Sequence, residues 1–277
     1  MAEKNANSKA TQRDEARKKA QALKVAQERR EKRTRMIIIA TAILGLVVVG
    51  LLVKIILGNE KPEISNAKDL SGVENVPSVV GEDGGIRFGK ELVAGTDNGD
   101  VPEVAVYFDY LCHNCADFEA QNGADLEAAA QAGEITLVFH PVAILEPIPY
   151  GSGVSTRASA AFTYIAENAP ENALAFHKAL MAQKIFNSTT AQRFTDQQIT
   201  DLAIAQGVPE DVAKAAVSGK YEDYVTAGTG MAAGNADLKN SSGTFGTPTV
   251  VIDGKKFTQN WATEGLLMEA VNAVTGK

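Results

Sequence analysis

The chain has 277 residues, of which 45% are hydrophobic and 22% are charged, so it can bury a sizeable core in one or two domains. Its formal net charge of −7 is unevenly divided: residues 1–35 hold twelve Lys and Arg against five Asp and Glu, whereas the rest holds fifteen against twenty-nine. No aromatic residue interrupts the basic segment. This favours a cytoplasmic tail that sets membrane topology over a nucleic-acid-binding surface, and no nucleic-acid partner is expected.

A predicted membrane-spanning segment follows the basic tail. Ile37 to Val53 are seventeen residues without a charge, and Ile55-Ile56-Leu57 extend the run beyond Lys54. No Ala-x-Ala motif follows promptly, so the sequence predicts an uncleaved signal anchor over residues 36–57, although a buried core helix or a cleaved signal peptide would fit the same run. With the tail 1–35 in the cytoplasm, the body would lie outside it, held at the cell membrane by a single pass.

Residues 58–85 are expected to form a linker. They are polar, contain Pro77 and the pair Gly84-Gly85, and show no sustained apolar periodicity. The folded domain is predicted to cover residues 86–277.

The beginning of that domain has the pattern of a strand–helix–strand unit. A leading strand is predicted from Ile86, and Val104 to Phe108 form a short apolar run typical of a central strand buried on both faces. A helical pattern then runs to about Ala132, where Gly133 provides a stop, and a second apolar strand follows at Ile135 to Phe139. Two strands joined by a helix in this way are expected to be parallel.

A helical region of about residues 151–240 comes next. Its most specific feature is Thr195 with Gln198 three residues later, which predicts a capping box. Sheet returns in the run from Pro248 to Ile252, and the pair Asp253-Gly254 predicts a hairpin turn. Helices are expected at Ser155 to Asn168, Glu171 to Lys184, Tyr221 to Leu238 and Thr263 to Val274.

Cys112 and Cys115 are the only cysteines in the chain, and they lie where an apolar strand gives way to a helix. A disulfide that closes so short a loop would stabilise the fold by only about 2 kcal/mol, so a structural staple is a poor explanation for the pair. A secreted domain held together by disulfides would also carry more cysteines at wider spacing. The pair therefore indicates a disulfide that is made and broken, in a compartment where disulfides persist.

This order of elements resembles the DsbA-like thiol–disulfide oxidoreductases, which have a thioredoxin fold with a helical insertion. Two motifs carry the resemblance, which covers about residues 86–274. They are Tyr107 to Cys115, with the sequence YFDYLCHNC, and Gly246 to Thr249, with the sequence GTPT. Together with the predicted anchor, the resemblance implies an α/β, thioredoxin-like fold with an inserted helical subdomain at about 151–240, preceded by a single transmembrane helix.

The resemblance also implies roles for the site residues. Cys112 would be the nucleophile at the helix N-terminus, where free N–H groups and the positive end of the dipole lower its pKa. Cys115, one turn later, would be the less exposed resolving thiol, and a protonated His113 would add a favourable charge. Thr247 and Pro248, joined by a cis peptide bond, would lie beside the cysteines and present backbone groups to a substrate strand. No cofactor is expected beyond the redox-active Cys112–Cys115 disulfide.

Two positions depart from the family pattern. His113 replaces the proline common after the first cysteine, and Val106 replaces the acid that many members bury six residues before that cysteine. Asp109 could supply the missing carboxylate or cap the helix that carries the cysteines. Glu146 is expected to be a solvated loop acid.

A metal site is the competing interpretation of Cys112, His113 and Cys115, with His140 or His177 as a further ligand. Zinc and copper sites use closely spaced cysteines and histidines. The set is thin, because His140 ends a strand and His177 lies within a predicted helix, where each is more often a structural residue. A metal-binding assembly factor is therefore the weaker alternative.

The sequence thus predicts an extracytoplasmic enzyme that forms disulfides in reduced or unfolded secreted proteins. A disulfide reductase or isomerase is the alternative within the same class. By resemblance, turnover would need a membrane quinone-linked partner that reoxidises the cysteine pair. No nucleotide-binding glycine loop, Ser-His-Asp order or pair of carboxylates points to another chemistry.

Overall fold

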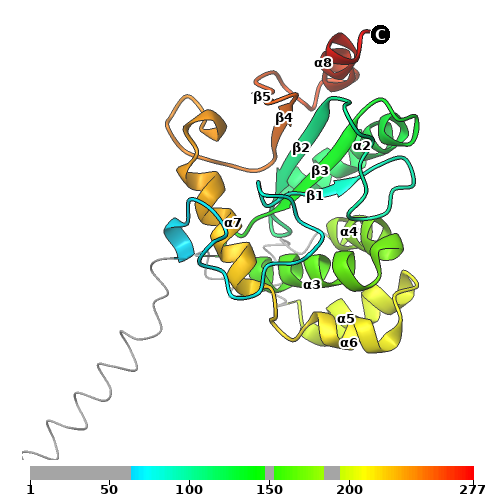
Figure 1. Ribbon diagram of the computed structural model, residues 1–277, viewed down its shortest axis with the longest axis vertical. Helices are drawn as coiled ribbons and strands as arrows, with labels where there is room; N and C mark the ends of the chain where they lie inside the picture. Colours follow the sequence, from blue (N-terminus) through cyan, green and yellow to red (C-terminus); the bar gives the residue numbers. More distant parts are fainter. Residues whose placement is uncertain (1–63, 147–152, 184–193) are drawn as a thin grey trace, which may run out of the picture. The chain divides into compact units, whose positions relative to one another are not determined.

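A five-stranded sheet lies at the centre of the computed structural model, which describes residues 64–146, 153–183 and 194–277 (Figure 1). The strand order is β1-β3-β2-β4-β5. Strands β2 and β3 are parallel, whereas β1 is antiparallel to β3, β4 to β2 and β5 to β4. The strands are β1 (Ile86–Phe88), β2 (Glu103–Phe108), β3 (Thr136–Pro141), β4 (Thr249–Ile252) and β5 (Lys255–Lys256).

Helix α2 (His113–Gln131) joins β2 to β3, and α8 (Leu266–Thr275) lies against α2 and β4. Side chains alternate along β2, so that Val104, Val106 and Phe108 enter the core shared with these helices. The predicted strand–helix–strand unit with parallel strands is therefore confirmed. The other α-helices are α3 (Val154–Asn168), α4 (Ala173–Ala182), α5 (Asp196–Ala205), α6 (Glu210–Ala216) and α7 (Glu222–Gly234), and the 3-10 helices are η1 (Ile64–Asn66), η2 (Pro170–Asn172) and η3 (Ala236–Leu238).

Helices α3 to α6 gather at one end of the sheet and form the helical insertion (Figure 1). The predicted capping box is present: the Thr195 hydroxyl accepts from the Gln198 N–H, and the Gln198 side chain accepts from the Thr195 N–H. Three predicted helices are shorter than expected, and one of them, predicted from Thr263, begins at Leu266 as α8. The one predicted from Glu171 starts at Ala173, after the 3-10 turn η2, and the one predicted to reach Leu238 ends at Gly234 before η3.

An aromatic cluster joins the ends of β2 and β3 to this insertion. The Phe108 ring meets the Phe139 ring edge-on at 5.4 Å and the Phe162 ring at 6.0 Å. The His177 ring lies 4.6 Å from both Phe108 and Phe139. Edge-to-face pairs of this kind stabilise a fold by about 0.5–1.5 kcal/mol each beyond the burial of their area. The cluster fixes the end of β2, from which the chain leads to Cys112.

Residues 64–85, assigned to the linker from the sequence, lie partly against the domain. Helix η1 packs on α7, and the Tyr224 hydroxyl donates to the Gly84 carbonyl at 2.7 Å. Leu70 and Val73 pack against a second apolar cluster around Tyr224. After η1, the apolar residues of this segment cover a surface without forming a further helix or strand, so their spacing has no regular period.

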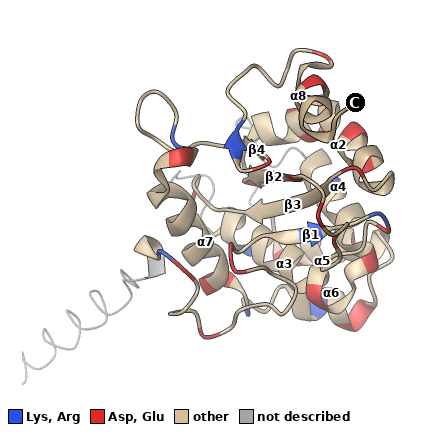
Figure 2. Cartoon of the chain, turned by 45° about the horizontal axis from the view of Figure 1, so that its top comes forward, with Lys and Arg blue, Asp and Glu red and all other residues tan. Residues whose placement is uncertain are grey.

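Two predicted segments fall outside the described residues. These are the tail 1–35 and the anchor 36–57, which include the apolar run Ile37 to Val53. Within the described ranges, none of the helices is both long enough and apolar enough to span a bilayer. In the part of the chain that is described, the cartoon in Figure 2 carries more red, for Asp and Glu, than blue, for Lys and Arg, in keeping with the acidic composition of the body.

The close approach of η1 to α7 gives a stability prediction. A Cβ added to Gly230 would lie 2.6 Å from the Ser65 carbonyl oxygen, whereas a Cβ on Gly228 of the same helix meets nothing within 4 Å. Gly228→Ala should raise the free energy of unfolding by about 0.5–1 kcal/mol through the lower entropy of the unfolded chain. Gly230→Ala should lower it by about 1–3 kcal/mol, because backbone must move to relieve the clash.

Urea unfolding of the two variants beside the wild type measures both effects. Equal gains in stability would contradict the packing of η1 on α7.

Candidate active site at the start of helix α2

Helix α2 begins beside the first of the two cysteines. Strand β2 ends at Phe108, and a short turn follows in which the Cys112 N–H donates to the Asp109 carbonyl at 2.9 Å. Cys112 is the N-cap of α2, with an extended backbone (φ −86°, ψ 113°), and its carbonyl accepts from the N–H groups of Cys115 and Ala116 at 3.0 and 3.2 Å. Its sulfur therefore lies at the helix end where N–H groups lack helical partners.

The loop before β4 brings a second part of the site to Cys112. Strand β4 pairs antiparallel with β2, with Thr249 opposite Tyr107, so the residues before β4 lie beside the residues after β2. The Cys112 thiol donates to the Thr247 carbonyl at 3.3 Å, and the Thr247–Pro248 peptide bond is cis. The prediction of a cis bond beside the cysteines is confirmed.

The two thiols are free and buried, but their acidities differ. A hydrogen bond with the Cys115 thiol is the largest cause that lowers the pKa of Cys112 to about 6; Thr247 and the N–H groups of Asn114 and Cys115 add to it, and burial opposes it. Burial raises the pKa of Cys115 well above its usual value, and the hydrogen bond and charge of Cys112 raise it further. Near neutral pH, one sulfur is therefore a thiolate and the other a thiol.

The cause of the low Cys112 pKa differs in part from the prediction. The sequence assigns it mainly to the helix terminus, whereas the Cys115 thiol contributes most. The N–H groups of the first turn act in the expected direction. His113, expected to add a favourable charge, is the exposed first residue of α2.

Asp109 lies fully buried behind the cysteine turn and does not cap α2, whose N-cap is Cys112. One carboxylate oxygen accepts from the Leu111 N–H at 2.8 Å and from the Ser155 hydroxyl at 2.6 Å, and the other accepts from the Leu145 N–H at 2.9 Å. Burial raises the pKa of Asp109 to about 6 against these three donors, and the charge of Cys112 adds to the rise. The sequence left two roles open for Asp109: capping α2 or supplying the missing carboxylate. The structure shows a buried carboxyl near Cys112 that does not cap the helix.

Glu146 is not the solvated loop acid expected from the sequence. Its carboxylate accepts from the Gly153 N–H and from the Thr156 N–H and hydroxyl, the last two at 2.8 and 2.7 Å. These groups belong to the N-terminal turn of α3, so Glu146 satisfies the free donors of that helix. The sequence could not show this because the carboxylate and its partners belong to different segments.

The histidines of the metal hypothesis lie in other environments. Among the described residues, no group of three or more His, Cys, Asp and Glu side chains could hold a metal ion. His140 lies at the end of β3, stacked on the Tyr107 ring at 4.1 Å, and its Nε2 is 3.7 Å from Asp83 Oδ2. Burial lowers the pKa of His140 to about 4, so the ring is neutral at pH 7.

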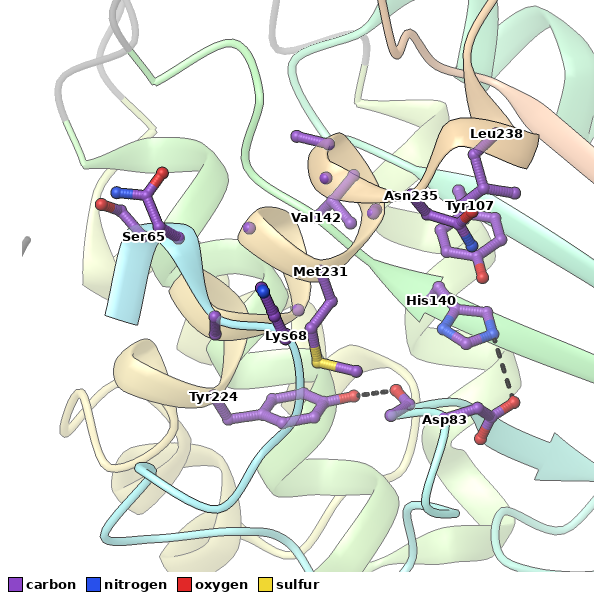
Figure 3. Close-up of a pocket in the computed structure, with 18 of the residues that line it drawn as sticks. Ser65, Lys68, Asp83, Tyr107, His140, Val142, Tyr224, Met231, Asn235 and Leu238 are labelled. Atoms are coloured by element: carbon purple, nitrogen blue, oxygen red, sulfur yellow. Dashed lines mark hydrogen bonds and ion pairs between the residues drawn. The ribbon is translucent and has the colours of Figure 1, made fainter. Parts of the chain in front are cut away.

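His140 and Tyr107 line a cavity of about 620 Å³. Figure 3 shows the His140 ring between Tyr107 and Asp83, with Met231 of α7 across the space from them. Because side chains alternate along β2, Tyr107 points away from the face that packs on α2. This cavity is therefore separate from the buried core behind the cysteines.

Sequence reasoning missed two buried polar contacts near the cysteines. The His177 Nδ1 lies 3.0 Å from the Tyr110 hydroxyl, and its Nε2 lies 3.4 Å from a carboxylate oxygen of Glu119 on α2. Burial raises the pKa of Glu119, but its interactions with His177 outweigh burial and lower it. An acid four residues after Cys115, on the face of α2 that also carries Leu126, is the one sequence signal of this pair. Nothing in the sequence marks Ser155, the partner of Asp109.

The sequence of this chain matches a model of a known protein family. A family model described as Thioredoxin matches residues 89–270, which is more than half of the chain. The chain belongs to the thioredoxin family. No curated protein matches it by sequence.

Several solved structures have the same thioredoxin-family architecture. Oxidised DsbA of Mycobacterium tuberculosis is 27% identical, with 70% of this chain and 93% of that chain covered and a TM-score of 0.56. MdbA of Actinomyces oris, a thiol–disulfide oxidoreductase, is 26% identical, with 76% and 99% covered and a TM-score of 0.59. DsbG of M. tuberculosis, a disulfide bond oxidoreductase, is 26% identical, with 72% and 91% covered and a TM-score of 0.57. These findings confirm the DsbA-like resemblance and identify the chain as a thiol–disulfide oxidoreductase of that type.

The site of this thioredoxin-family enzyme can carry out thiol–disulfide exchange. A thiol attacks best when its pKa is near the ambient pH, and a thiol of low pKa is also a good leaving group. Cys112 satisfies both conditions with its pKa of about 6. Cys115 stays protonated and buried until it is needed to break a mixed disulfide.

The low pKa of Cys112 predicts a bend in the pH dependence of the reduction potential. Below about pH 6, reduction of the disulfide takes up two protons, so the potential should fall by about 60 mV per pH unit. Above that pH, Cys112 remains a thiolate, one proton is taken up, and the slope should halve to about 30 mV.

Equilibration of the full chain with glutathione between pH 4.5 and pH 8 measures this bend. Its sign follows from linkage: a lowered thiol pKa stabilises the folded reduced form fully above the usual thiol pKa, and that stabilisation is lost as pH falls through about 6. A single slope of about 60 mV up to pH 8 would show an unperturbed Cys112.

Proposed function

We propose that this chain is an extracytoplasmic disulfide oxidase, held at the cell membrane by one N-terminal helix, that forms disulfides in reduced or unfolded secreted proteins. The observation that carries this proposal is the pKa of Cys112, lowered to about 6 beside the buried Cys115. Stabilising the thiolate stabilises the reduced form, and this makes the corresponding disulfide a stronger oxidant. An oxidant of this kind needs a compartment in which its products persist.

In the forward reaction, a substrate thiolate attacks the Cys112 sulfur of the Cys112–Cys115 disulfide. A new S–S bond forms to Cys112, the old one breaks, and Cys115 leaves as a thiolate that takes up a proton, as its raised pKa favours. A second substrate thiolate then attacks the substrate sulfur of the mixed disulfide and displaces Cys112 as a thiolate. The substrate has lost two electrons, and the enzyme holds them as a thiol and a thiolate.

Asp109 is the group we assign to proton handling in this reaction. It is fully buried, and the Cys112 charge raises its pKa, so its protonation is linked to that of the nucleophile. With a pKa of about 6, it can release or accept a proton near neutral pH. It would thus take the place of the acid that Val106 replaces.

Thr247 and Pro248 form the surface that would hold the substrate. The Thr247 carbonyl accepts from the Cys112 thiol, so a peptide segment that pairs with this backbone would place its own cysteine next to Cys112. Pairing through backbone groups reads little sequence, which suits an enzyme that acts on many unfolded chains. The 26–27% identical relatives named DsbA and MdbA support the same activity.

Turnover requires a partner that removes two electrons from the Cys112–Cys115 dithiol. A membrane quinone-linked oxidase has the right chemistry and would share the membrane of the predicted anchor. The alternative, a reductase or isomerase, is separated from the oxidase by the potential measured above. A reduction potential of about −120 mV would be typical of DsbA. A reduction potential of about −270 mV would be typical of thioredoxin and would contradict an oxidase.

The assigned roles of the cysteines predict which variant traps substrates. In Cys115→Ala, the Cys112 thiolate can still attack a substrate disulfide and displace one substrate thiolate, but no resolving thiol remains to break the mixed disulfide. This variant should accumulate covalent complexes at several times the wild-type level on non-reducing gels, and they should disappear with dithiothreitol. Cys112→Ala is the matched control and should trap few; the reverse pattern would exchange the two roles.

The proposed location predicts the behaviour of a fusion protein. Alkaline phosphatase folds to an active form only where its disulfides can form. A fusion after Lys277 should therefore be active and remain in the membrane fraction, whereas a control fusion after Arg35 should be inactive. Inactivity of the first fusion would reverse the topology, and release of a soluble active form would show a cleaved signal peptide.

A further inference from the structure

A hydroxyl of the helical insertion lies next to the cysteine turn. Ser155, in the first turn of α3, donates its hydroxyl proton to Asp109 Oδ1 at 2.6 Å. Both residues are 0% exposed. A bond of this length to a buried carboxylate is a strong, charge-assisted one.

We propose that Ser155 is a positioning residue that sets the redox behaviour of Cys112 by way of Asp109, so that the helical insertion tunes the cysteine pair. The inference rests on the proposed function, because it assumes that protonation of Asp109 is linked to thiol–disulfide exchange. Ser155 itself does not react with the substrate.

Three segments meet at the Asp109 carboxylate. Leu111 belongs to the turn before Cys112, Leu145 to the loop after β3, and Ser155 to α3. The donors of Leu111 and Leu145 are backbone N–H groups, whereas the donor of Ser155 is its side-chain hydroxyl. Ser155→Ala therefore removes one donor and leaves the other two in place. The Asp109 carbonyl also accepts from the Cys112 N–H at 2.9 Å, which ties this anchored residue to the nucleophile.

Charge links Asp109 to Cys112 in both directions. The Cys112 thiolate raises the pKa of Asp109, and by reciprocity an ionised Asp109 disfavours the thiolate. The Ser155 hydroxyl favours the ionised carboxylate and so acts against the thiolate. Without this hydroxyl, Asp109 would hold its proton to a higher pH, and the reduced enzyme would be stabilised wherever the change makes Asp109 neutral.

Other titratable groups around Asp109 have their own partners. Cys115 is hydrogen-bonded to Cys112, the Glu146 carboxylate accepts from the first turn of α3, and the Tyr110 hydroxyl contacts His177. Cys112 is thus the charge that acts on Asp109 most directly.

Helix α3 contains a matched control. Ser159 lies one turn after Ser155 and is also 0% exposed, but its hydroxyl has no hydrogen-bond partner among the described residues. Ser155→Ala and Ser159→Ala therefore remove the same atom from the same buried helix, and one of the two changes breaks a bond to Asp109. A purely structural effect should appear in both variants.

The experiment is the equilibrium of each full-length variant with glutathione between pH 4.5 and pH 8. Loss of one charge-assisted hydrogen bond in Ser155→Ala should raise the pKa of Asp109 by about one unit. The equilibrium constant for reduction should then be the same in the variant and the wild type at pH 8. At pH 6 it should be about threefold larger in the variant, in favour of the reduced form. Ser159→Ala should give a variant-to-wild-type ratio of one at every pH. A flat ratio for Ser155→Ala would overturn the proposal, as would the same pH profile in both variants.

A double-variant cycle tests the route through Asp109. In an Asp109→Asn background, Ser155→Ala should no longer change the pH profile, because the carboxyl that it acts on is absent. A profile change that persists there would overturn the proposal. Failure of the proposed oxidase function would look different from failure of this proposal. The wild-type equilibrium constant would then lie in the thioredoxin range, and the comparison between the variants could still be interpreted.

Discussion

The antiparallel pairing of β2 with β4 is the constraint on which the site depends. Tyr107 lies opposite Thr249 and Val106 opposite Val250, so the chain leaving β2 and the chain entering β4 meet at the same end of the sheet. This brings the Cys112 thiol within 3.3 Å of the Thr247 carbonyl, although the two residues are 135 positions apart. A shift of one residue in this register would turn every side chain of β4 to the other face and separate the two halves of the site.

Two acidic side chains near the cysteines are held by partners from other elements. Asp109 is bonded to Ser155 of α3 and to the loop after β3, and Glu119 is paired with His177 of α4. Burying such groups without partners would cost several kcal/mol, so the helical insertion is needed for the stability of the site as well as for its shape. The insertion thus supplies a hydrogen-bond donor to the carboxyl beside Cys112.

Short-range patterns explain the parts of the fold and site that the sequence predicts correctly. The apolar run before Cys112, the helical spacing after it and the capping box at Thr195 each depend on residues within a few positions of one another. Where apolar residues cover a surface without regular spacing, as in residues 64–85, the pattern indicates a linker although part of the segment packs on the domain. The Glu146 assignment failed for a similar reason, because its partners belong to the first turn of α3 and local sequence spacing does not reveal the contact.

By itself, the sequence determined that Cys112 starts a helix and that Cys115 follows one turn later, and its resemblance to the DsbA-like enzymes implied that Thr247 and Pro248 complete the site. These features follow from local spacing and from motifs that few folds share. The tertiary structure alone decided that the Cys115 thiol is the largest cause of the low Cys112 pKa and that Asp109 bonds to Ser155 instead of capping α2. The physical reason is that hydrogen bonds and burial act over a few ångströms in space. The first turn of α2 brings the two sulfurs together, whereas only the packing of α3 against the cysteine turn brings Ser155 to Asp109.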